Sequence, residues 1–350
     1  PRENADYIFC FNGEIYNFKS IVKKYNLKQS NSDTKICFDL LNKVGFENMV
    51  KELDGMFSIA VYNKTSKKIC CAIDRFGQKP LYYNCTNGNF SVCSSLRTIA
   101  KVSNFSLQDL DTYSIDNFLS FGYFPGEMTP LKKTFKLMPG HIAIIDISGK
   151  TQIKRYCYPK RATNSEFKEE MYSVLKTSLK RSIIDTALHS DTKYVGVSFS
   201  GGLDSSLVCG TLLNNQIDLQ SYTISFPDTV DYDEAKNARD IFKKLGGKNL
   251  SIIEIRQKEI EDACVSFFEQ MDIPIADPSL VATQFVYKAA RQDGLKYVVG
   301  GDGADELFLG YPNIMAHRIS AYTKWLSIFT PELILKKMSQ INSNSDFPFL

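Results

Sequence analysis

The pattern of hydrophobic residues changes near Ser165, and this change limits the possible folds more than any other feature of the sequence. After it, segments with helical periodicity alternate with short apolar segments that have the length of buried strands. This alternation is typical of βαβ units and predicts a parallel, doubly wound α/β sheet. The expected helices cover residues 165–187, 205–213, 233–245, 257–270 and 280–293, and the expected strands cover residues 194–199, 220–226, 249–255 and 297–300.

Before this change the sequence has the pattern of short strands in antiparallel sheets. The expected strands cover residues 7–11, 57–62, 68–73, 81–84 and 90–94. The one helix expected among them covers residues 32–44 and ends at Gly45. A helix, a loop with Gly and Pro, and a hairpin follow. We therefore expect a layered α+β domain over residues 1–157 and an α/β domain over residues 158–350, because 350 residues of 43% hydrophobic content suit two cores.

Charge and cysteine content argue against several classes of function. The 42 Lys and Arg residues nearly balance the 39 Asp and Glu residues, so nothing favours nucleic acid or an acidic membrane as a partner. The nine Cys residues lack zinc-ligand spacing, and no apolar run is long enough for a membrane span or a signal peptide. We expect a soluble, cytoplasmic protein that acts on small-molecule substrates, and a homodimer is compatible with this.

The segment SGGLDSS at residues 200–206, between an apolar strand and a helix, carries the strongest chemical signal. Glycines let backbone N–H groups approach phosphate oxygens, serines add donors, and the helix N-terminus favours an anion. The segment has Asp204 where a Walker-type loop would have Lys, which favours Mg²⁺ between carboxylate and phosphate. A turn that merely caps a helix would explain an isolated Gly-Gly pair better than it explains all seven residues.

A second loop, GGDGADE at residues 300–306, follows the last expected strand and should open at the same carboxyl edge of the sheet. Its three carboxylates would repel one another without a cation, so Asp305 is a candidate Mg²⁺ ligand together with Asp204. The alternative is that these carboxylates form the acidic N-terminus of a helix through Leu307 and Phe308.

Together these loops resemble those of the asparagine synthetase family, which couples a glutamine amidotransferase domain to an ATP-pyrophosphatase domain. The other segments similar to family motifs are NGEIYN at 12–17, SD at 32–33, DRFGQKPLYY at 74–83, DYDEA at 231–235 and DIPIADPS at 272–279. The resemblance covers essentially the whole chain. It implies an N-terminal nucleophile-type glutaminase fold followed by a doubly wound sheet.

The resemblance implies that ammonia from glutamine attacks an aspartyl adenylate made from ATP, giving asparagine, AMP and pyrophosphate. It implies ATP and Mg²⁺ as cofactors. The implied catalytic residues are Asp302, in the adenylate step, and Asn12 and Gly13, in an oxyanion hole. The implied binding residues are Asn12, Gly13, Glu14 and Asp33 for glutamine, Asp204 and Asp305 for the metal, and Ser198, Ser200, Gly201, Gly202, Asp204, Ser205, Ser206, Ile224, Gly300 and Gly301 for ATP. A hairpin turn at Asn12-Gly13 and core packing of Ile224 are the structural alternatives.

The sequence also departs from the family pattern. The chain begins with Pro1 where the family has a nucleophilic Cys, and Cys10 lies inside an expected strand, so we expect a chain truncated at both ends that does not hydrolyse glutamine. Lys35, Ser95, Gly300 and Leu309 replace the Glu, Glu, Ser and Gly of the family. Two alternatives stay open: an amidotransferase that acts on another carboxylate, such as a surface-sugar acid or a peptide, and a non-catalytic ATP-binding homologue.

Overall fold

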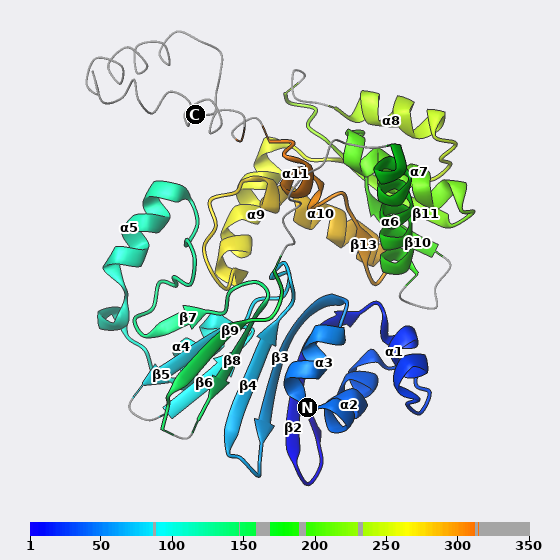
Figure 1. The fold of residues 1–350 in the computed structure, drawn as a ribbon. Helices are drawn as coiled ribbons and strands as arrows, with labels where there is room; N and C mark the ends of the chain where they lie inside the picture. The colour runs from blue at the N-terminus through cyan, green and yellow to red at the C-terminus, as the bar shows by residue number, and fades with distance from the viewer. Residues whose placement is uncertain are drawn as a thin grey trace, which may run out of the picture.

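The computed structural model describes residues 1–86, 89–146, 148–158, 169–188, 194–229, 234–311 and 314. The chain forms two halves, each built around its own sheets (Figure 1). The first half has two antiparallel sheets and the second half has one parallel sheet, which confirms the predicted α+β and α/β classes.

A six-stranded antiparallel sheet, in the order β1-β2-β3-β4-β8-β9, forms the centre of the first half. Its strands are β1 (Arg2–Glu3), β2 (Tyr7–Ile15), β3 (Gly55–Asn63), β4 (Lys68–Ile73), β8 (His141–Ile145) and β9 (Thr151–Arg155). The helices α1 (Phe18–Tyr25), α2 (Asp33–Val44) and α3 (Phe46–Glu52) cover one face of this sheet. Because side chains alternate along a strand, Phe57 and Ile59 of β3 enter the core under these helices, whereas Ala60 faces the other way.

A three-stranded sheet, in the order β6-β5-β7, packs against the opposite face. The elements of this part are β5 (Tyr82–Thr86), β6 (Asn89–Cys93), β7 (Thr134–Lys136), α4 (Leu96–Val102) and α5 (Thr112–Phe121). Ile73 and Ile145 of the large sheet meet Tyr83 of the small one. On the outer face of the small sheet, Leu96 of α4 packs on Tyr82. The layers therefore run helix, sheet, sheet, helix.

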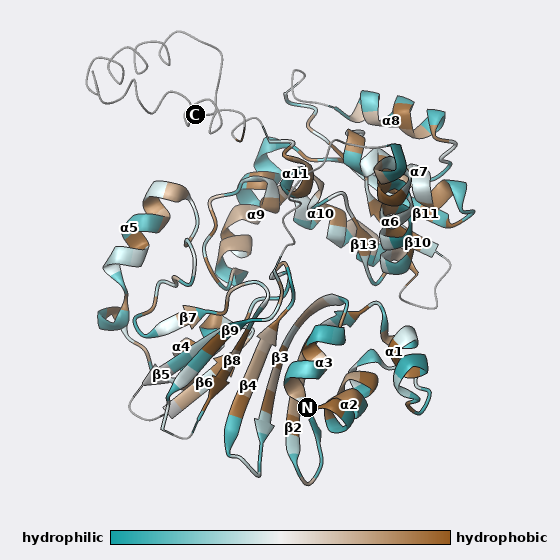
Figure 2. Ribbon diagram, in the orientation of Figure 1, coloured by the Kyte–Doolittle hydropathy of each residue, from teal (hydrophilic) through white to brown (hydrophobic). Residues whose placement is uncertain are grey.

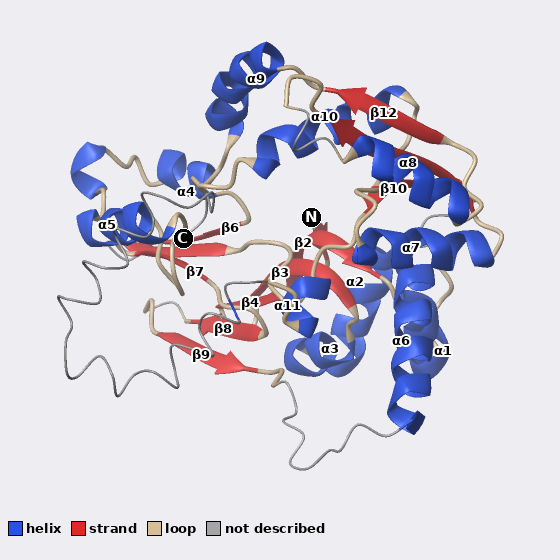
Figure 3. Ribbon diagram, turned by 90° about the horizontal axis from the view of Figure 1, so that it is seen from above, coloured by secondary structure: helices blue, strands red, loops and turns tan. Residues whose placement is uncertain are grey.

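The parallel sheet of the second half has the order β12-β11-β10-β13, with helices on both faces. Its elements are α6 (Glu169–Ala187), β10 (Tyr194–Ser198), α7 (Leu203–Asn214), β11 (Asp218–Ser225), α8 (Ala235–Lys244), β12 (Leu250–Glu254), α9 (Gln257–Gln270), α10 (Ser279–Gln292), β13 (Val298–Val299) and α11 (Ala304–Phe308). Val197 of β10 packs with α6, α7 and α8, which Figure 3 shows together on one side. Tyr222 of β11 packs with α10 on the other side.

The hydrophobic pattern of the sequence predicts the longer helices and misses several short ones. The pattern predicts α9 with its observed bounds. The helix expected over residues 32–44 is α2, which begins one residue later because Ser32 is its N-cap and ends at Gly45 as expected. In α8, Ala238 and Phe242 are buried. Figure 2 shows hydrophobic and hydrophilic stretches alternating along this helix. The pattern does not predict α1, α3 and α4, which have seven or eight residues each and so offer only about two turns of periodicity.

Candidate active sites

The two loops predicted to form the ATP site lie against each other at the carboxyl edge of the parallel sheet. Loop 200–206 follows β10 and loop 300–306 follows β13, and these two strands are adjacent and parallel, with Val197 opposite Val299. A Cβ on Gly301 would lie 2.8 Å from Cβ of Asp204 and 3.1 Å from the backbone nitrogen of Ser205. Only a glycine therefore allows this approach.

This place in the sheet is a topological switch point. From β10 the chain moves through β11 and β12 on one side and returns to β13 on the other. The helix α7, which follows β10, packs on one face of the sheet, and α10, which precedes β13, packs on the other. Open α/β sheets bind their ligands at the carboxyl ends of the strands at such a point.

The geometry of loop 200–206 suits a phosphate group. Gly202 is the N-cap of the 12-residue α7, and a glycine has no side chain that could cap the helix. The first N–H groups of α7 are therefore not capped by the N-cap side chain and can bind an anion. Gly201 has φ +81°, and a Cβ there would lie 2.8 Å from Cα of Ala238. Ser200 Oγ accepts from the Gly202 N–H at 3.2 Å and lies 3.1 Å from Ser205 Oγ.

Ser206 adds a possible donor at this loop. Its Oγ is buried and has no hydrogen-bond partner among the residues that the structure describes. A buried hydroxyl without a partner costs free energy, and a phosphate oxygen would satisfy it.

In loop 300–306 the structure confirms the helix interpretation, because the helix α11 begins inside the loop. Gly303 caps this helix with φ 93°, and Asp305 and Glu306 lie in its first turn. The hydroxyl of Tyr311 donates to Glu306 at 2.8 Å, and this bond lowers the pKa of the Glu306 carboxyl. Asp302 stays exposed in front of the helix. The segment is therefore a helix N-terminus as well as a cluster of carboxylates.

The described residues include no group of three His, Cys, Asp or Glu side chains that could hold a metal ion by themselves. Asp204 and Asp305 nevertheless lie on two loops that touch each other. Mg²⁺ in nucleotide sites is commonly held by one or two carboxylates together with phosphate oxygens and water. The two adjoining loops offer this number of carboxylates, one from each loop.

The remaining residues predicted for ATP lie at strand ends around the same crevice. Ser198 is the last residue of β10, and Gly300 directly follows β13. Ile224 of β11 packs against the cluster of Tyr222 and Val286, so the core-packing interpretation of Ile224 is correct at least in part. Of the DYDEA segment, residues 231–233 lie outside the described residues.

The residues predicted for glutamine gather at the end of β2. The hairpin interpretation of Asn12-Gly13 is wrong, because β2 continues to Ile15 and stays paired with β3, Gly13 opposite Phe57. Gly13 has φ +149°, and a Cβ there would lie 2.1 Å from the carbonyl oxygen of Met56. Asn12 and Glu14, two residues apart, point to the same face of the strand.

Asp33 lies beside this strand end. It begins α2, which Ser32 caps, and its Oδ2 accepts from the backbone N–H of Ile15 at 3.0 Å. The structure thus brings Asn12, Gly13, Glu14 and Asp33 together, although Asp33 follows the strand by 18 residues.

Sequence reasoning treated Asp74 only as part of a motif, but the structure gives it a specific role. Its carboxylate is fully buried and accepts from the N–H groups of Phe57 at 3.2 Å, Phe76 at 3.0 Å, Gln78 at 3.2 Å and Lys79 at 3.2 Å. These bonds tie the loop after β4 to the segment of β3 opposite Gly13. An Asp directly after an apolar strand, followed by a Gly/Pro-containing loop, is the signal that could have indicated this role.

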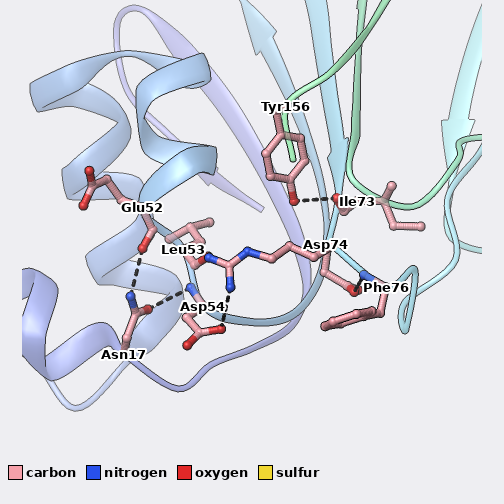
Figure 4. Close-up of polar contacts among 9 residues, drawn as sticks. Asn17, Glu52, Leu53, Asp54, Ile73, Asp74, Phe76 and Tyr156 are labelled. Carbon is pink, nitrogen blue, oxygen red and sulfur yellow. Dashed lines mark hydrogen bonds and ion pairs between the residues drawn. The ribbon is translucent and has the colours of Figure 1, made fainter. Parts of the chain in front are cut away.

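A second set of bonds fixes the turn between β2 and α1 (Figure 4). Asn17 donates to the carbonyl of Glu52 at 2.8 Å and accepts from the N–H of Asp54 at 3.0 Å. Arg75 pairs with Asp54 at 3.1 Å. The carboxyl end of β2, where the predicted glutamine residues lie, is therefore held from both sides.

Comparison with known proteins gives matches along most of the chain. The family model of a glutamine amidotransferase domain matches residues 1–157, and the family model of asparagine synthase matches residues 175–347. A Methanocaldococcus jannaschii protein with the name putative asparagine synthetase (glutamine-hydrolyzing) 2 is 30% identical to this chain. The match covers 96% of this chain and 65% of that protein. Asparagine synthetase 1 of Bacillus subtilis is 27% identical, over 88% of this chain and 48% of its own length.

The asparagine synthetase of Cricetulus griseus is 26% identical, over 86% of this chain and 54% of its own length. The chain thus spans between about half and two thirds of the length of these relatives. Among solved structures, a glutamine phosphoribosylpyrophosphate amidotransferase from B. subtilis matches this chain at 12% identity. The match covers 72% of this chain and 62% of that protein, and its TM-score of 0.32 is too low to support an argument. Within the described residues, no helix has the length and apolar character needed to cross a membrane.

Proposed function

Because this chain belongs to the asparagine synthetase family, we propose that its protein converts aspartate, ATP and glutamine into asparagine, AMP, pyrophosphate and glutamate. The observation that supports this best is the contact of loops 200–206 and 300–306 at the switch point of the parallel sheet. A phosphate-binding loop next to a carboxylate cluster suits a reaction in which pyrophosphate leaves a magnesium nucleotide.

In the second half, the N-terminal N–H groups of α7 and the hydroxyls of Ser200 and Ser206 would hold the pyrophosphate portion of ATP. Magnesium, held by Asp204 and Asp305, would neutralise charge that builds up on the phosphates. A carboxylate oxygen of aspartate attacks the α-phosphorus and pyrophosphate leaves. Ammonia then attacks the acyl carbon, AMP leaves, and the excess proton is released. We assign Asp302, exposed beside the crevice, to this adenylate step.

In the first half, the Asn12 amide and the Gly13 N–H would stabilise the oxyanion formed when the glutamine amide is attacked. Asp33 would bind the α-ammonium group of glutamine, with Glu14 beside it. Asp33 suits this role because the Ile15 N–H already fixes the position of its carboxylate at the end of β2.

We also propose a reducing, cytoplasmic location. The cysteines whose side chains the structure describes are all free thiols, which suits such a compartment.

The test is pyrophosphate release from Mg-ATP and ammonia by the protein extended to its natural ends, with and without aspartate. Release that depends on aspartate is expected. Release that depends on a different carboxylic acid would assign the protein to another amidotransferase activity. No release with any acid, despite ATP binding, would contradict the proposed catalysis.

A further inference from the structure

The loop between α9 and α10 reaches across to the first half of the chain and caps one of its helices. Both carboxylate oxygens of Asp272 take part. They accept from Ser95 Oγ at 2.7 Å and from the backbone N–H groups of Leu96 at 2.6 Å and Arg97 at 3.0 Å. Ser95 is the N-cap of α4, so an acidic side chain from the other half occupies the positive end of this helix.

Arg97 makes the reciprocal contact. Its Nη2 donates to the carbonyl oxygens of Glu269 at 2.6 Å and Met271 at 2.7 Å. These carbonyls belong to the last turn and the C-cap of α9, where a positive charge is favourable. Each half of the chain thus caps a helix end of the other.

The residues that follow continue the contact. Ile273 packs against the cluster of Tyr82 and Leu96, and the N–H of Ala276 donates to the carbonyl of Gly122, at the end of α5, at 2.8 Å. A Cβ on Gly122 would lie 3.2 Å from Cβ of Ala276. The segment 272–276 is therefore held at both of its ends by the first half.

The same segment leads directly into the second candidate active site. It is followed by α10, which packs on β11. Burial raises the pKa of the Tyr287 phenol on α10, and the negative charge of Asp302 raises it further. Tyr287 therefore lies near Asp302. The contact between the halves and the acidic loop are thus joined through a single helix.

We propose that Asp272 and Arg97 are positioning residues: their reciprocal helix caps, which we name the interdomain clasp, hold the glutaminase and synthetase sites in the alignment needed to use glutamine nitrogen. This inference rests on the proposed function. The clasp contributes neither to glutamine hydrolysis nor to adenylation, and its loss releases ammonia to solvent.

The functional test uses the protein extended to its natural ends, with Asp272→Ala and Arg97→Ala. We expect the asparagine formed per glutamate to fall by about fivefold or more with glutamine, while asparagine synthesis from free ammonia stays at the parent rate. The matched control is Asp111→Ala, because Asp111 caps α5 within its own domain, accepting from the Tyr113 N–H at 3.2 Å. An unchanged product ratio in both clasp variants would overturn the proposal, and so would an equal fall in the control.

A second measurement does not depend on any activity. In the chain of residues 1–350, hydrogen exchange at the Leu96 and Arg97 amides should become faster in Asp272→Ala and stay unchanged in Asp111→Ala. If the extended protein makes no asparagine from either nitrogen source, the proposed function fails, and exchange still decides whether the clasp forms. Unchanged exchange in Asp272→Ala would overturn the clasp itself.

Discussion

At the scale of single residues, Leu309 has a backbone conformation that suits a glycine. It is the C-cap of α11, with φ 60° and ψ 41°, and it replaces a glycine of the family pattern. A side chain in the left-handed region costs about 1–2 kcal/mol because Cβ crowds the following carbonyl. The side chain is 58% exposed and so recovers little of this by packing.

We therefore predict that Leu309→Gly increases the free energy of unfolding by about 1 kcal/mol. Thermal or urea unfolding of the chain measures this. Leu307→Gly is the control, because Leu307 is 62% exposed but lies inside the helix. There the glycine should destabilise. A fall in stability for both variants would contradict the interpretation.

Asp204 gives a second prediction at this scale. Asp204→Ala should reduce aspartate-dependent pyrophosphate release to background, because it removes a carboxylate from the proposed magnesium site. Asp218→Ala is the control, since Asp218 is an exposed residue at the amino end of β11. Raising Mg²⁺ should not restore the first variant. Release at the parent rate would refute the metal assignment.

The sequence indicated which segments meet at each candidate site, because each motif lies in one short segment next to a recognisable strand. The contact of Asp272 with Ser95 could not be predicted in this way. Those residues are 177 positions apart, and their contact depends on how two domains pack together. Ser95 was recognisable only as a departure from the family, whereas the structure shows it as the N-cap of α4.

At the scale of elements, buried backbone bonds hold the loop after β4. Asp74→Ala would leave four N–H groups without their acceptor, one in β3 and three in the loop after β4. We predict a loss of at least about 3 kcal/mol of unfolding free energy, measured by urea denaturation. Asp146→Ala is the control: Asp146 also accepts from its own turn, at the Ser148 and Lys150 N–H groups, but it is only partly buried, and its loss should matter less.

Predictability also followed element length. The 12-residue α2 and the 14-residue α9 and α10 repeat their apolar positions often enough to be recognised. The two-residue β13 carries almost no pattern of its own. A strand was expected over residues 297–300, but only Val298 and Val299 pair with β10, so the observed strand has two residues.

At the scale of the whole molecule, buried tyrosines should make stability depend on alkaline pH. Burial, with the Asp272 charge adding to it, raises the pKa of Tyr82 from 10.0 to about 12, and burial with Glu127 raises the pKa of Tyr83 to about 12. An unfolded phenol loses its proton near pH 10, whereas these phenols keep theirs to about pH 12 in the folded state. Their contribution is therefore intact below pH 10 and is lost as the pH rises from 10 to 12.

We predict that the unfolding free energy, followed by urea titration, falls across this range, and that Tyr82→Phe loses less of it than the parent does. A pH profile identical in the variant and the parent would contradict the role of Tyr82. Measurement below pH 10 is the internal control, because neither state releases phenolic protons there.

The pairing of β10 with β13 also has a consequence for biosynthesis. Gly196 is paired with Val298, so the crevice is closed by strands about a hundred residues apart. A ribosome completes the phosphate loop long before it makes the acidic loop beside it. The proposed ATP crevice therefore has only one wall until β13 is made and pairs with β10.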